Sequence, residues 1–478
     1  MFHDSVQHIS QMLDDICSRP VRVVSGSSIL VALAEELALF AGAGFLLFAL
    51  DDLAVDLIYI ARRLWRGVTV YSRFPRAFAQ TLSAPTTPGW LAIFIPAWDE
   101  SAVIAPMLRT TLNRFGKGNY RLFVGHYPND PSTGSAISLI DDPRVISVEL
   151  PHDGPTTKAD CLNHLFAALR IEEGRQGRSR AIILHDAEDV VHPAELKIFE
   201  TLIDRVAALQ LPVVPLPDPY SRWIAGHYGD EFAESHGKEL VVREAVGAAV
   251  PLAGVGCAIQ RDAIDRLAET NDGLPFEPDS MTEDYEIGLR LGAMGLKTMF
   301  VRMPATPGDR SAVATRGHFP TTLDAAVRQK ARWIGGIALS GWERLGWRGG
   351  LGERWMRMRD RRGPFAALLM VAGYAAALLW AQLALAHALG APIAPTVGPK
   401  LIILLQLNAL LLTWRMLVRA IFTTAAYGFR QGLLSVPRLL VANVIAILAV
   451  KRAIALHGAR GPRQWDKTSH IFPRELGA

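Results

Sequence analysis

The sequence predicts an α/β domain with an open, mainly parallel sheet that is joined to a membrane by apolar helices. Two features indicate this architecture. The ends of the 478-residue chain carry long runs of Leu, Ala, Val and Phe, whereas the middle alternates short strand-like runs with helical patterns. Half of the residues are hydrophobic and 20% are charged, which excludes a disordered chain. The net charge is only +4, and the basic residues lie beside the apolar runs, so no nucleic-acid partner is expected.

The N-terminal part of the chain predicts one membrane helix. Residues 1–27 lack the basic start, short apolar run and cleavage site of a signal peptide, so the N-terminal segment at residues 1–36 is expected to stay on the chain. Residues 37–60 are long enough to cross a bilayer, although Asp51, Asp52 and Asp56 lie toward the C-terminal end of this run. Each acid would cost roughly 2.5 to 3.5 kcal/mol at the centre of a membrane. The three acids are therefore expected to reach the headgroups or to face protein.

Two further apolar runs, at residues 365–386 and 401–426, predict a second and a third membrane helix. Arg415 and Arg419 interrupt the third. With these helices crossing in alternate directions, the arginines lie at a depth similar to that of the acids of the first helix. Buried charges in membranes usually find partners, so Asp52 is predicted to pair with Arg415 or Arg419. The alternative, in which acids and arginines reach the interface separately, stays open.

Basic residues beside the apolar runs predict the orientation. Arginines follow the first run and precede the second, so both flanks, and the domain at residues 83–345 between them, should face the cytoplasm. The last apolar stretch is too short to span, and its crossing would export the basic tail at residues 458–478. An amphipathic helix at the cytoplasmic interface is therefore predicted for residues 436–457. The flanking arginines are Arg62, Arg63, Arg66, Arg73, Arg76, Arg357, Arg359, Arg361 and Arg362.

Four short apolar or β-branched runs predict the sheet of the middle domain, at residues 91–97, 120–125, 144–150 and 180–185. No GxGxxG or GxxxxGK[ST] follows them, so a dinucleotide fold and a P-loop lose support. Ligands of such sheets bind beyond the carboxyl ends of the strands, which makes the polar residues there candidate site residues. They are Asp99 and Glu100 after the first run, Tyr127 and Asp130 after the second, and Asp186, Glu188 and Asp189 after the fourth.

The strongest local motif is HDAEDVVHP, which follows a buried strand. Asp186 and Glu188 lie one residue apart at the sheet edge, where carboxylate oxygens can hold Mg²⁺ or Mn²⁺ beside a diphosphate. An alternative role is open for Asp189 and His192, which could cap a helix that begins at Pro193.

A second motif, MTEDYEIGLRLGAMG, predicts a helix with Thr282 as its N-cap. Glu283 and Asp284 then lie in the first turn, where acids stabilise a helix through its dipole. The same field keeps a carboxylate ionised, as a general base requires. The structural and the catalytic interpretation are both open at this point.

A third motif, RQKARW, places Gln329, Arg332 and Trp333 on one face of a helix. This face offers an amide, a guanidinium suited to phosphate and a flat ring suited to a sugar. The alternative is an amphipathic helix that rests on the membrane, and the two interpretations are compatible.

In this order the motifs resemble the membrane-bound family 2 glycosyltransferases of the GT-A fold, the group of cellulose, chitin and hyaluronan synthases. FIPAWDE resembles the first nucleotide-binding strand, HDAE the DxD metal motif, TED the catalytic-base motif and QKARW the QxxRW motif. YPNDPST, HDAEDVVHP and WDKTSHIFP are similar to the bacteriophage adsorption protein B type. One departure concerns the second DxD acid, which is Glu188 here, so Asp189 is a further candidate for the metal contact.

The resemblance implies inverting, metal-dependent transfer of a sugar from a nucleotide sugar, expected to be UDP-linked, to a hydroxyl of a lipid or a growing glycan. It implies a multi-pass protein of the bacterial inner membrane that makes a cell-surface polysaccharide, with an outer-membrane export partner as a further expectation. The alternative is a membrane anchor or surface receptor whose transferase domain is degenerate.

The resemblance also implies roles for single residues. Asp284 is implied as the base, with Glu283 beside it, and this role requires Asp186 and Asp284 to line one cavity. The remaining implied roles are Asp186, Glu188 and Asp189 for Mg²⁺ or Mn²⁺, Asp99, Glu100, Tyr127, Asp130, Lys158 and Arg332 for the donor, and Gln329 and Trp333 for the acceptor.

Overall fold

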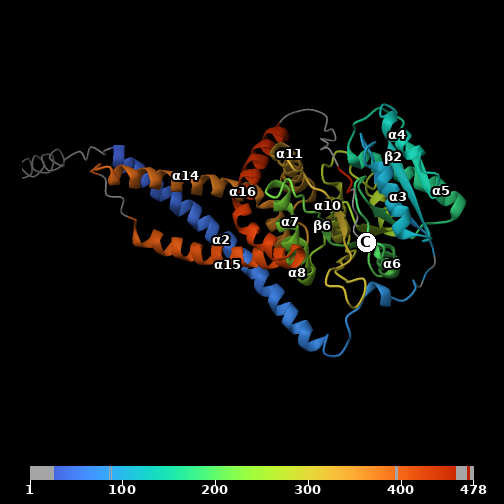
Figure 1. The fold of residues 1–478 in the computed structure, drawn as a ribbon, viewed down its shortest axis with the longest axis horizontal. Helices are drawn as coiled ribbons and strands as arrows, with labels where there is room; N and C mark the ends of the chain where they lie inside the picture. The colour runs from blue at the N-terminus through green and yellow to red at the C-terminus, as the bar shows by residue number, and fades with distance from the viewer. Residues whose placement is uncertain (1–25, 86, 88, 393–396, 459–470, 474–478) are drawn as a thin grey trace, which may run out of the picture. The chain divides into compact units, whose positions relative to one another are not determined.

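The structure, a computed structural model, describes residues 26–85, 87, 89–392, 397–458 and 471–473 (Figure 1). The chain divides into two compact units. One comprises residues 1–47 and 369–409, and the other comprises residues 48–368 and 410–478.

The first unit consists of parts of three long helices, α2 (Gly26–Thr69), α14 (Gly363–Ala388) and α15 (Pro399–Tyr427). Small residues allow the helices to approach closely, as in many membrane bundles. A Cβ atom added to Gly42 would lie 2.9 Å from Leu404 Cδ2, and one added to Gly373 would lie 3.0 Å from the Phe45 ring. Asn408 Nδ2 donates a hydrogen bond of 2.9 Å to the Gly42 carbonyl oxygen. Close apolar packing and the amide contact of Asn408 thus hold the described helices of this unit together.

In the part of the chain that the structure describes, four helices are long and apolar enough to cross a membrane, namely α2, α14, α15 and α16 (Phe429–Gly458). The predicted runs at residues 37–60, 365–386 and 401–426 lie within the first three. The helix predicted at residues 436–457 lies within α16, which begins earlier and includes Pro437. In the second unit α16 packs against α7 (Ile224–Glu234) and α11 (Leu323–Ile334). The premise that this stretch is too short to span is wrong, because α16 has 30 residues and is long and apolar enough to cross a membrane. The location of residues 436–457 at the membrane interface stays a prediction.

A seven-stranded sheet with the order β3-β2-β1-β4-β7-β5-β8 forms the centre of the second unit (Figure 1). All neighbours are parallel except β7, which runs antiparallel to β4 and β5. The mainly parallel sheet and its four predicted strands are confirmed. The strands are β1 (Leu91–Pro96), β2 (Tyr120–His126), β3 (Val145–Glu149), β4 (Ala181–Leu184), β5 (Ala208–Gln210), β7 (Cys257–Gln260) and β8 (Thr298–Phe300).

Helices cover both faces of this sheet, and β1 shows why. Its alternate residues Ile93 and Ile95 enter one buried cluster, and Ala92 and Phe94 enter another. A strand with a period of two residues can be apolar throughout only if both faces are covered. The first cluster includes residues of α3 (Ile104–Phe115) and α6 (Glu195–Leu202), and the second includes residues of α5 (Lys158–Gln176), α9 (Arg261–Glu269) and α10 (Glu283–Ala293).

Short elements complete the unit. A two-stranded sheet pairs β6 with β9, and π-helical turns follow α7 and α11. The remaining elements are η1 (Ala79–Thr81), α4 (Pro131–Ser138), η2 (Ile203–Arg205), β6 (Val213–Pro215), η3 (Ser235–Glu239), α8 (Leu240–Ala245), β9 (Thr315–Gly317), η4 (Gly335–Ser340), α12 (Gly341–Leu345) and α13 (Leu351–Arg361).

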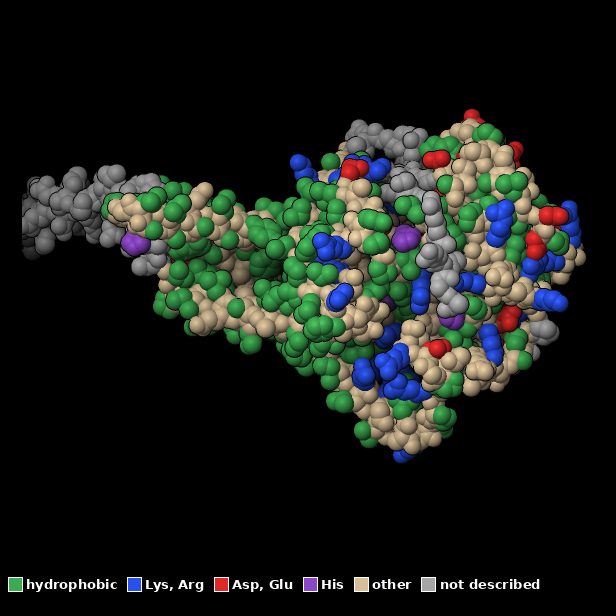
Figure 2. Space-filling model, in the orientation of Figure 1, with side chains coloured by type: hydrophobic (Ala, Val, Ile, Leu, Met, Phe, Trp, Pro, Cys, Tyr) green, Lys and Arg blue, Asp and Glu red, His purple; other side chains and the backbone are tan. Residues whose placement is uncertain are grey.

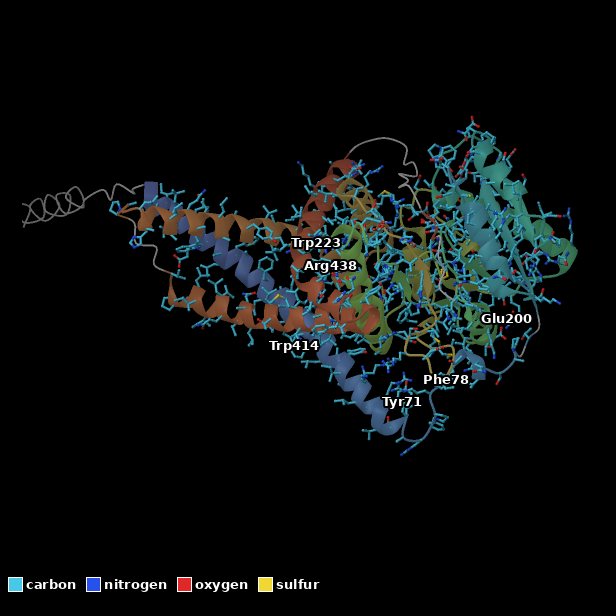
Figure 3. The ribbon with its side chains drawn as sticks, viewed as in Figure 1. Tyr71, Phe78, Glu200, Trp223, Trp414 and Arg438 are labelled. Atoms are coloured by element: carbon cyan, nitrogen blue, oxygen red, sulfur yellow. The ribbon has the colours of Figure 1, made fainter. Side chains whose placement is uncertain are left out.

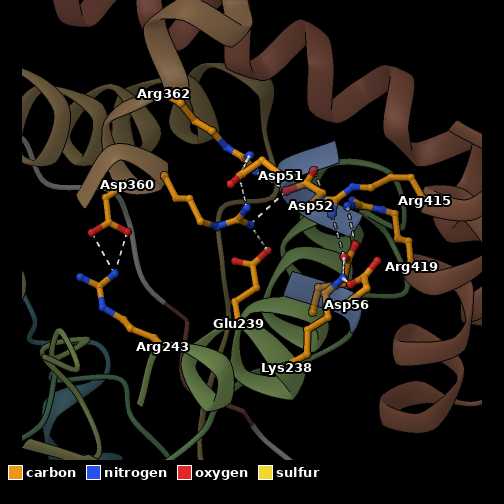
Figure 4. Close-up of polar contacts among 12 residues, drawn as sticks. Asp51, Asp52, Asp56, Lys238, Glu239, Arg243, Asp360, Arg362, Arg415 and Arg419 are labelled. Atoms are coloured by element: carbon orange, nitrogen blue, oxygen red, sulfur yellow. Dashed lines mark hydrogen bonds and ion pairs between the residues drawn. The ribbon is translucent and has the colours of Figure 1, made fainter. Parts of the chain in front are cut away.

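A network of buried charges surrounds the part of α2 that belongs to this unit (Figure 4). Asp52 accepts from Arg362 at 2.6 Å and from Arg359 at 3.0 Å, and Arg415 lies 3.2 Å away. Asp51 pairs with the same two arginines of residues 359–362. The predicted pairing of Asp52 with Arg415 is confirmed, because burial leaves a carboxylate few partners except cations.

The predicted alternative partner, Arg419, does not pair with Asp52. Its guanidinium lies 3.7 Å from Asp230 and 3.5 Å from Glu234, both on α7. Asp56 pairs with Lys238, and Trp414 Nε1 donates to Asp56 at 2.9 Å. The acids of α2 are therefore compensated mainly by cations of the second unit whose sequence positions gave no sign of this role.

Candidate active site

A cavity of about 410 Å³ lies beyond the carboxyl ends of β1 and β4, and its lining contains most of the predicted site residues. Asp186 and Asp284 both line it, so the shared cavity required of them is present. The other predicted residues in its lining are Glu188 and Asp189 from the turn after β4, Glu100 after β1, Lys158 from α5, Glu283 from α10, and Gln329, Arg332 and Trp333 from α11.

The turn after β4 is held by Asp189. Its Oδ2 accepts the backbone N–H of Asp186 at 3.0 Å and lies 3.0 Å from His185 Nδ1. His185 Nε2 lies 2.7 Å from Glu195 Oε1 on α6. Burial lowers the pKa of His185, but the carboxylates of Glu195 and Asp189 raise it to about 10, so the imidazolium donates to both. This buried triad fixes the backbone that presents Asp186 and Glu188.

The alternative role of Asp189 and His192 as helix caps is wrong for Asp189. The helix begins at Glu195 rather than at Pro193, and its N-cap, Ala194, makes no side-chain capping bond. His192 Nδ1 accepts the backbone N–H of Ala194 at 3.0 Å and so stabilises the approach to the helix. Asp189 precedes the first residue of α6 by too many positions to cap it. Its carboxylate instead closes the preceding turn by accepting the backbone N–H of Asp186.

Lys158 connects the two acidic motifs. It begins α5, whose N-cap Thr157 accepts the backbone N–H of Asp160 at 3.1 Å. Lys158 Nζ lies 2.5 Å from Asp186 Oδ1 and 4.0 Å from Glu283 Oε1. Burial lowers the pKa of Lys158, but the carboxylates of Asp186, Glu283 and Asp284 raise it above its ordinary value. The lysine thus stays charged and stabilises carboxylates that would otherwise repel one another.

The first turn of α10 presents Glu283 and Asp284 to the cavity. Burial raises the pKa of both carboxyls, and the positive charge of Lys158 lowers both. Thr282 occupies the predicted N-cap position but makes no side-chain capping bond, and its Oγ1 is buried without a hydrogen-bond partner among the residues that the structure describes. Burial and a nearby cation are the two conditions that tune a carboxylate as a general base.

Gly254 is a site residue that the sequence did not reveal. Its φ of +73° suits glycine, and an added Cβ would lie 2.5 Å from Asp284 Oδ2 and 3.3 Å from Lys158 Nζ. Any side chain here would displace the base and the lysine. The GVG segment at residues 254–256, directly before a buried strand, is the signal that could have pointed to it.

Helix α11 presents Gln329, Arg332 and Trp333 to the cavity, as predicted from their spacing. Gln329 Oε1 and Arg332 Nε are buried and have no hydrogen-bond partner within the described part of the chain. An unsatisfied buried polar atom costs about 1 to 3 kcal/mol, so a ligand that bonds to these atoms recovers that energy. Trp333 also packs on Tyr228 and Phe232, with ring centroids 6.1 and 6.3 Å apart.

Three predicted donor-binding residues, Asp99, Tyr127 and Asp130, do not line this cavity. Asp130 caps α4 by accepting the backbone N–H of Thr133 at 3.3 Å, and its Oδ2 accepts the backbone N–H of Asp99 at 2.6 Å. The Tyr127 hydroxyl lies 2.7 Å from Thr156 Oγ1, and burial raises its pKa. These residues shape the turns after β1 and β2, and their contact with a donor stays a prediction.

The chemistry of the donor set fits a hard divalent cation. Asp186 and Glu188 bring carboxylate oxygens to one cavity, and such oxygens are the ligands that Mg²⁺ and Mn²⁺ prefer. Arg332 adds a guanidinium to the same cavity, at a site where a diphosphate could receive two kinds of positive contact.

Comparison with known proteins gives a family and a fold. Residues 181–425 match the model of glycosyl transferase family group 2. The chain is 37% identical over 461 residues to bacteriophage adsorption protein B of Escherichia coli (strain K12), and equally to bacteriophage N4 adsorption protein B of Escherichia coli O157:H7. These alignments cover 90% of this chain and 61% of the relatives, so the chain spans less than two thirds of their length.

Among solved structures, the mannosyltransferase PcManGT from Pyrobaculum calidifontis, in complex with GDP-Man and Mn²⁺, superposes with a TM-score of 0.52 at 16% identity. The match covers 89% of this chain and 99% of that one. The predicted GT-A fold is confirmed by this likeness together with the mixed sheet. Because the family model matches more than half of the chain, this protein belongs to glycosyl transferase family group 2.

Proposed function

We propose that this glycosyltransferase moves a sugar from a nucleotide sugar to a hydroxyl group, with inversion at the anomeric carbon. The observation that carries the proposal is the meeting of Asp186, Glu188, Asp284 and Arg332 in one cavity. An anionic leaving group is stabilised by positive charge, whereas a hydroxyl nucleophile is activated by a base that accepts its proton. Arg332 supplies positive charge for the first and Asp284 supplies a base for the second.

In the proposed mechanism Asp284 accepts the proton of the acceptor hydroxyl as its oxygen attacks the anomeric carbon. The bond between that carbon and the diphosphate breaks on the opposite side, which inverts the configuration. Arg332 stabilises the charge that develops on the departing diphosphate. Asp186 and Glu188 would hold Mg²⁺ or Mn²⁺, which neutralises the same charge when bound. Lys158 and Gly254 keep Asp186 and Asp284 in place, and Gln329 and Trp333 contact the acceptor.

The donor is proposed to carry UDP, and its sugar to be an N-acetylhexosamine. The structural relative from Pyrobaculum calidifontis holds GDP-Man, so GDP-sugars belong in the same test. The acceptor is proposed to be a lipid or a growing glycan at the cytoplasmic face of a bacterial inner membrane, with the product contributing to a cell-surface polysaccharide and leaving through an outer-membrane partner. The four apolar helices and the relationship to a phage adsorption protein support this setting.

The test is nucleotide release by the purified full chain in the presence of Mn²⁺, with a panel of UDP- and GDP-sugars. Asp284→Asn keeps the shape of the side chain but removes the base, and turnover should fall about 10² to 10⁴-fold. The matched control is Asp272→Asn, which removes one acid from outside the cavity. Asp272 has a φ of +48°, a backbone conformation that Asn also adopts, so this substitution should not strain the fold.

A degenerate transferase domain, the alternative function, predicts no turnover with any donor. Wild-type turnover that survives in Asp284→Asn would remove Asp284 from the role of base and leave the rest of the site in question.

A further inference from the structure

A second and larger cavity, of about 1080 Å³, lies in the unit that comprises residues 48–368 and 410–478. Among the described residues, none lines both this cavity and the carboxylate cavity. One wall is the C-terminal part of α2 and the segment that follows it, which carries Tyr71 and is seen in Figure 3. The opposite wall is formed by β8, the segment at residues 301–312 and the helix α8. Nothing in the proposed transfer reaction uses this cavity.

The lining of this second cavity is strongly basic. Lys and Arg side chains gather on the surface in Figure 2, close to the place where Figure 3 labels Tyr71. The guanidinium groups of Arg66 and Arg76 lie 5.2 and 4.8 Å from the centroid of the Tyr71 ring. Among the lining residues that the structure describes, Glu244 is the only acid. The arginines of the lining are Arg62, Arg63, Arg66, Arg76, Arg302 and Arg310.

These arginines lack the carboxylate partners that arginines elsewhere in this unit have. Arg359 and Arg362 pair with acids of α2, and Arg243 pairs with Asp360. In contrast, within the described residues no carboxylate lies within 4.0 Å of a side-chain nitrogen of the six lining arginines, and Arg66 Nε is buried without a hydrogen-bond partner. Like charges held around one cavity repel one another, so the arrangement leaves a net attraction for an anion.

Glu244 compensates this charge only in part. Burial raises its pKa, whereas Arg62, Lys297 and Arg66 lower it. One carboxylate cannot offset six guanidinium groups, and it lies on the wall opposite α2. The charge that remains matches a ligand with more than one negative charge.

The volume of the cavity and the apolar part of its lining further restrict the class of ligand that it can bind. Val68, Met299 and Met303 contribute apolar surface between the arginines. Sites for small molecules typically enclose about 300 to 1,000 Å³, so this cavity exceeds what a free phosphate ion fills. Arginine binds phosphate through a fork of N–H donors, which favours phosphate over other anions.

We propose that this cavity is a binding site for a phosphate-bearing molecule, whose phosphate contacts Arg66 and Arg76 and whose apolar part lies against Val68 and Met303. The phosphate belongs either to the headgroup of an anionic phospholipid or to a soluble organic phosphate. The site takes no part in the transfer reaction. A bound ligand would contact both the C-terminal end of α2 and β8, and would thereby hold the two elements together.

The first arm of the test uses inorganic pyrophosphate as the soluble probe, without divalent cations, on the purified full chain. Calorimetry should give saturable binding that weakens about tenfold for each arginine contact removed, in Arg76→Gln and again in Arg66→Gln/Arg76→Gln. The matched control is Arg73→Gln, which removes an exposed arginine from the same segment outside the lining. Its effect should stay below about twofold, since an exposed charge outside the lining is screened by salt.

The second arm identifies the source of the phosphate. The protein is placed in nanodiscs of phosphatidylcholine, with or without one third phosphatidylglycerol, and pyrophosphate binding is repeated. A lipid occupant predicts that phosphatidylglycerol competes with pyrophosphate in the wild type, and that Arg66→Gln/Arg76→Gln retains less phosphatidylglycerol on extraction. A soluble occupant predicts equal pyrophosphate binding in both nanodiscs.

Either result of the second arm supports the site. The proposal is overturned if the wild type shows no saturable binding, if binding survives unchanged in Arg66→Gln/Arg76→Gln, or if Arg73→Gln weakens it as much as Arg76→Gln does. Arg76 is exposed and its guanidinium lies over the Tyr71 ring, so its replacement is expected to leave the fold intact and to keep the comparison interpretable.

Discussion

The charge network around α2 predicts that Asp52 is energetically coupled to Arg415 and not to Arg419. Asp52, whose side chain is 13% exposed, has the guanidinium groups of Arg362, Arg359 and Arg415 at 2.6, 3.0 and 3.2 Å. The perturbation is a double-mutant cycle of Asp52→Asn with Arg415→Gln. A second cycle with Arg419→Gln serves as the control, because Arg419 pairs with acids of α7 instead.

The structure sets the expected magnitudes. Asp52→Asn leaves the three arginines with Asp51, Glu234 and Glu239 as their remaining acids. Removing one partner of a buried ion pair costs about 3 to 5 kcal/mol. Arg415→Gln costs less, about 1 to 3 kcal/mol, because Asp52 keeps two other arginines. The double variant should lose less than the sum by about 1 to 2 kcal/mol, since the second change removes a partner that is already missing.

The assay is thermal and denaturant unfolding of the wild type, the single variants and the double variants in one detergent. The control cycle of Asp52 with Arg419 should be additive within about 0.5 kcal/mol. The reasoning is refuted if the Asp52 and Arg415 cycle is also additive, or if the Asp52 and Arg419 cycle shows the larger coupling.

The remaining predictions concern the active site. His185→Gln leaves Asp189 and Glu195 buried without their cation, so unfolding should become easier by about 3 to 5 kcal/mol, seen as a lower melting temperature; a wild-type value would contradict the triad. Because the folded pKa of His185 is raised from 6.5 to about 10, its contribution to stability is fully present below pH 6.5 and lost as the pH rises toward 10. Burial raises the pKa of Asp284, and Asp284 must be deprotonated to act as the base. The pH profile of kcat/KM should therefore rise through a midpoint above about 3.9, the pKa of free Asp. A midpoint at or below that value would speak against Asp284 as the base. Gly254→Ala should lower kcat about 10²-fold by displacing Asp284. The control is Gly273→Ala, which carries similar backbone strain because Gly273 has a φ of +85°, but which should keep its activity because nothing lies within 4 Å of the added Cβ. Equal losses of kcat in both variants would point to backbone strain alone.

The local chemistry of the chain could be predicted from its sequence. The four strands show a β-branched or apolar run bounded by turn residues, and a run of that kind is a property of a few neighbouring positions. The same holds for the face shared by Gln329, Arg332 and Trp333, which follows from helical spacing alone. The carboxyl ends of parallel strands lie at one edge, which explains why Asp186 was placed correctly at the rim of the cavity.

The errors and omissions concern contacts between distant parts of the chain. The antiparallel strand β7 is inserted between β4 and β5, and its pairing depends on residues far away in the sequence. His185 connects Asp189 to Glu195 on α6, and Asp189 closes the turn after β4 instead of capping a helix, because α6 begins only at Glu195. Arg359 looked like a positive flank of a membrane helix, and only the folded chain makes it a partner of Asp51 and Asp52.

The amino-acid order by itself determined which chemical groups are available and on which strand end or helix face each one stands, because these follow from periodicities of two and 3.6 residues. Folding decided which of these groups meet. Lys158 between two acidic motifs, Gly254 against the base and the unpaired arginines beside Tyr71 all depend on packing between segments far apart in the chain, and no local spacing encodes such distances.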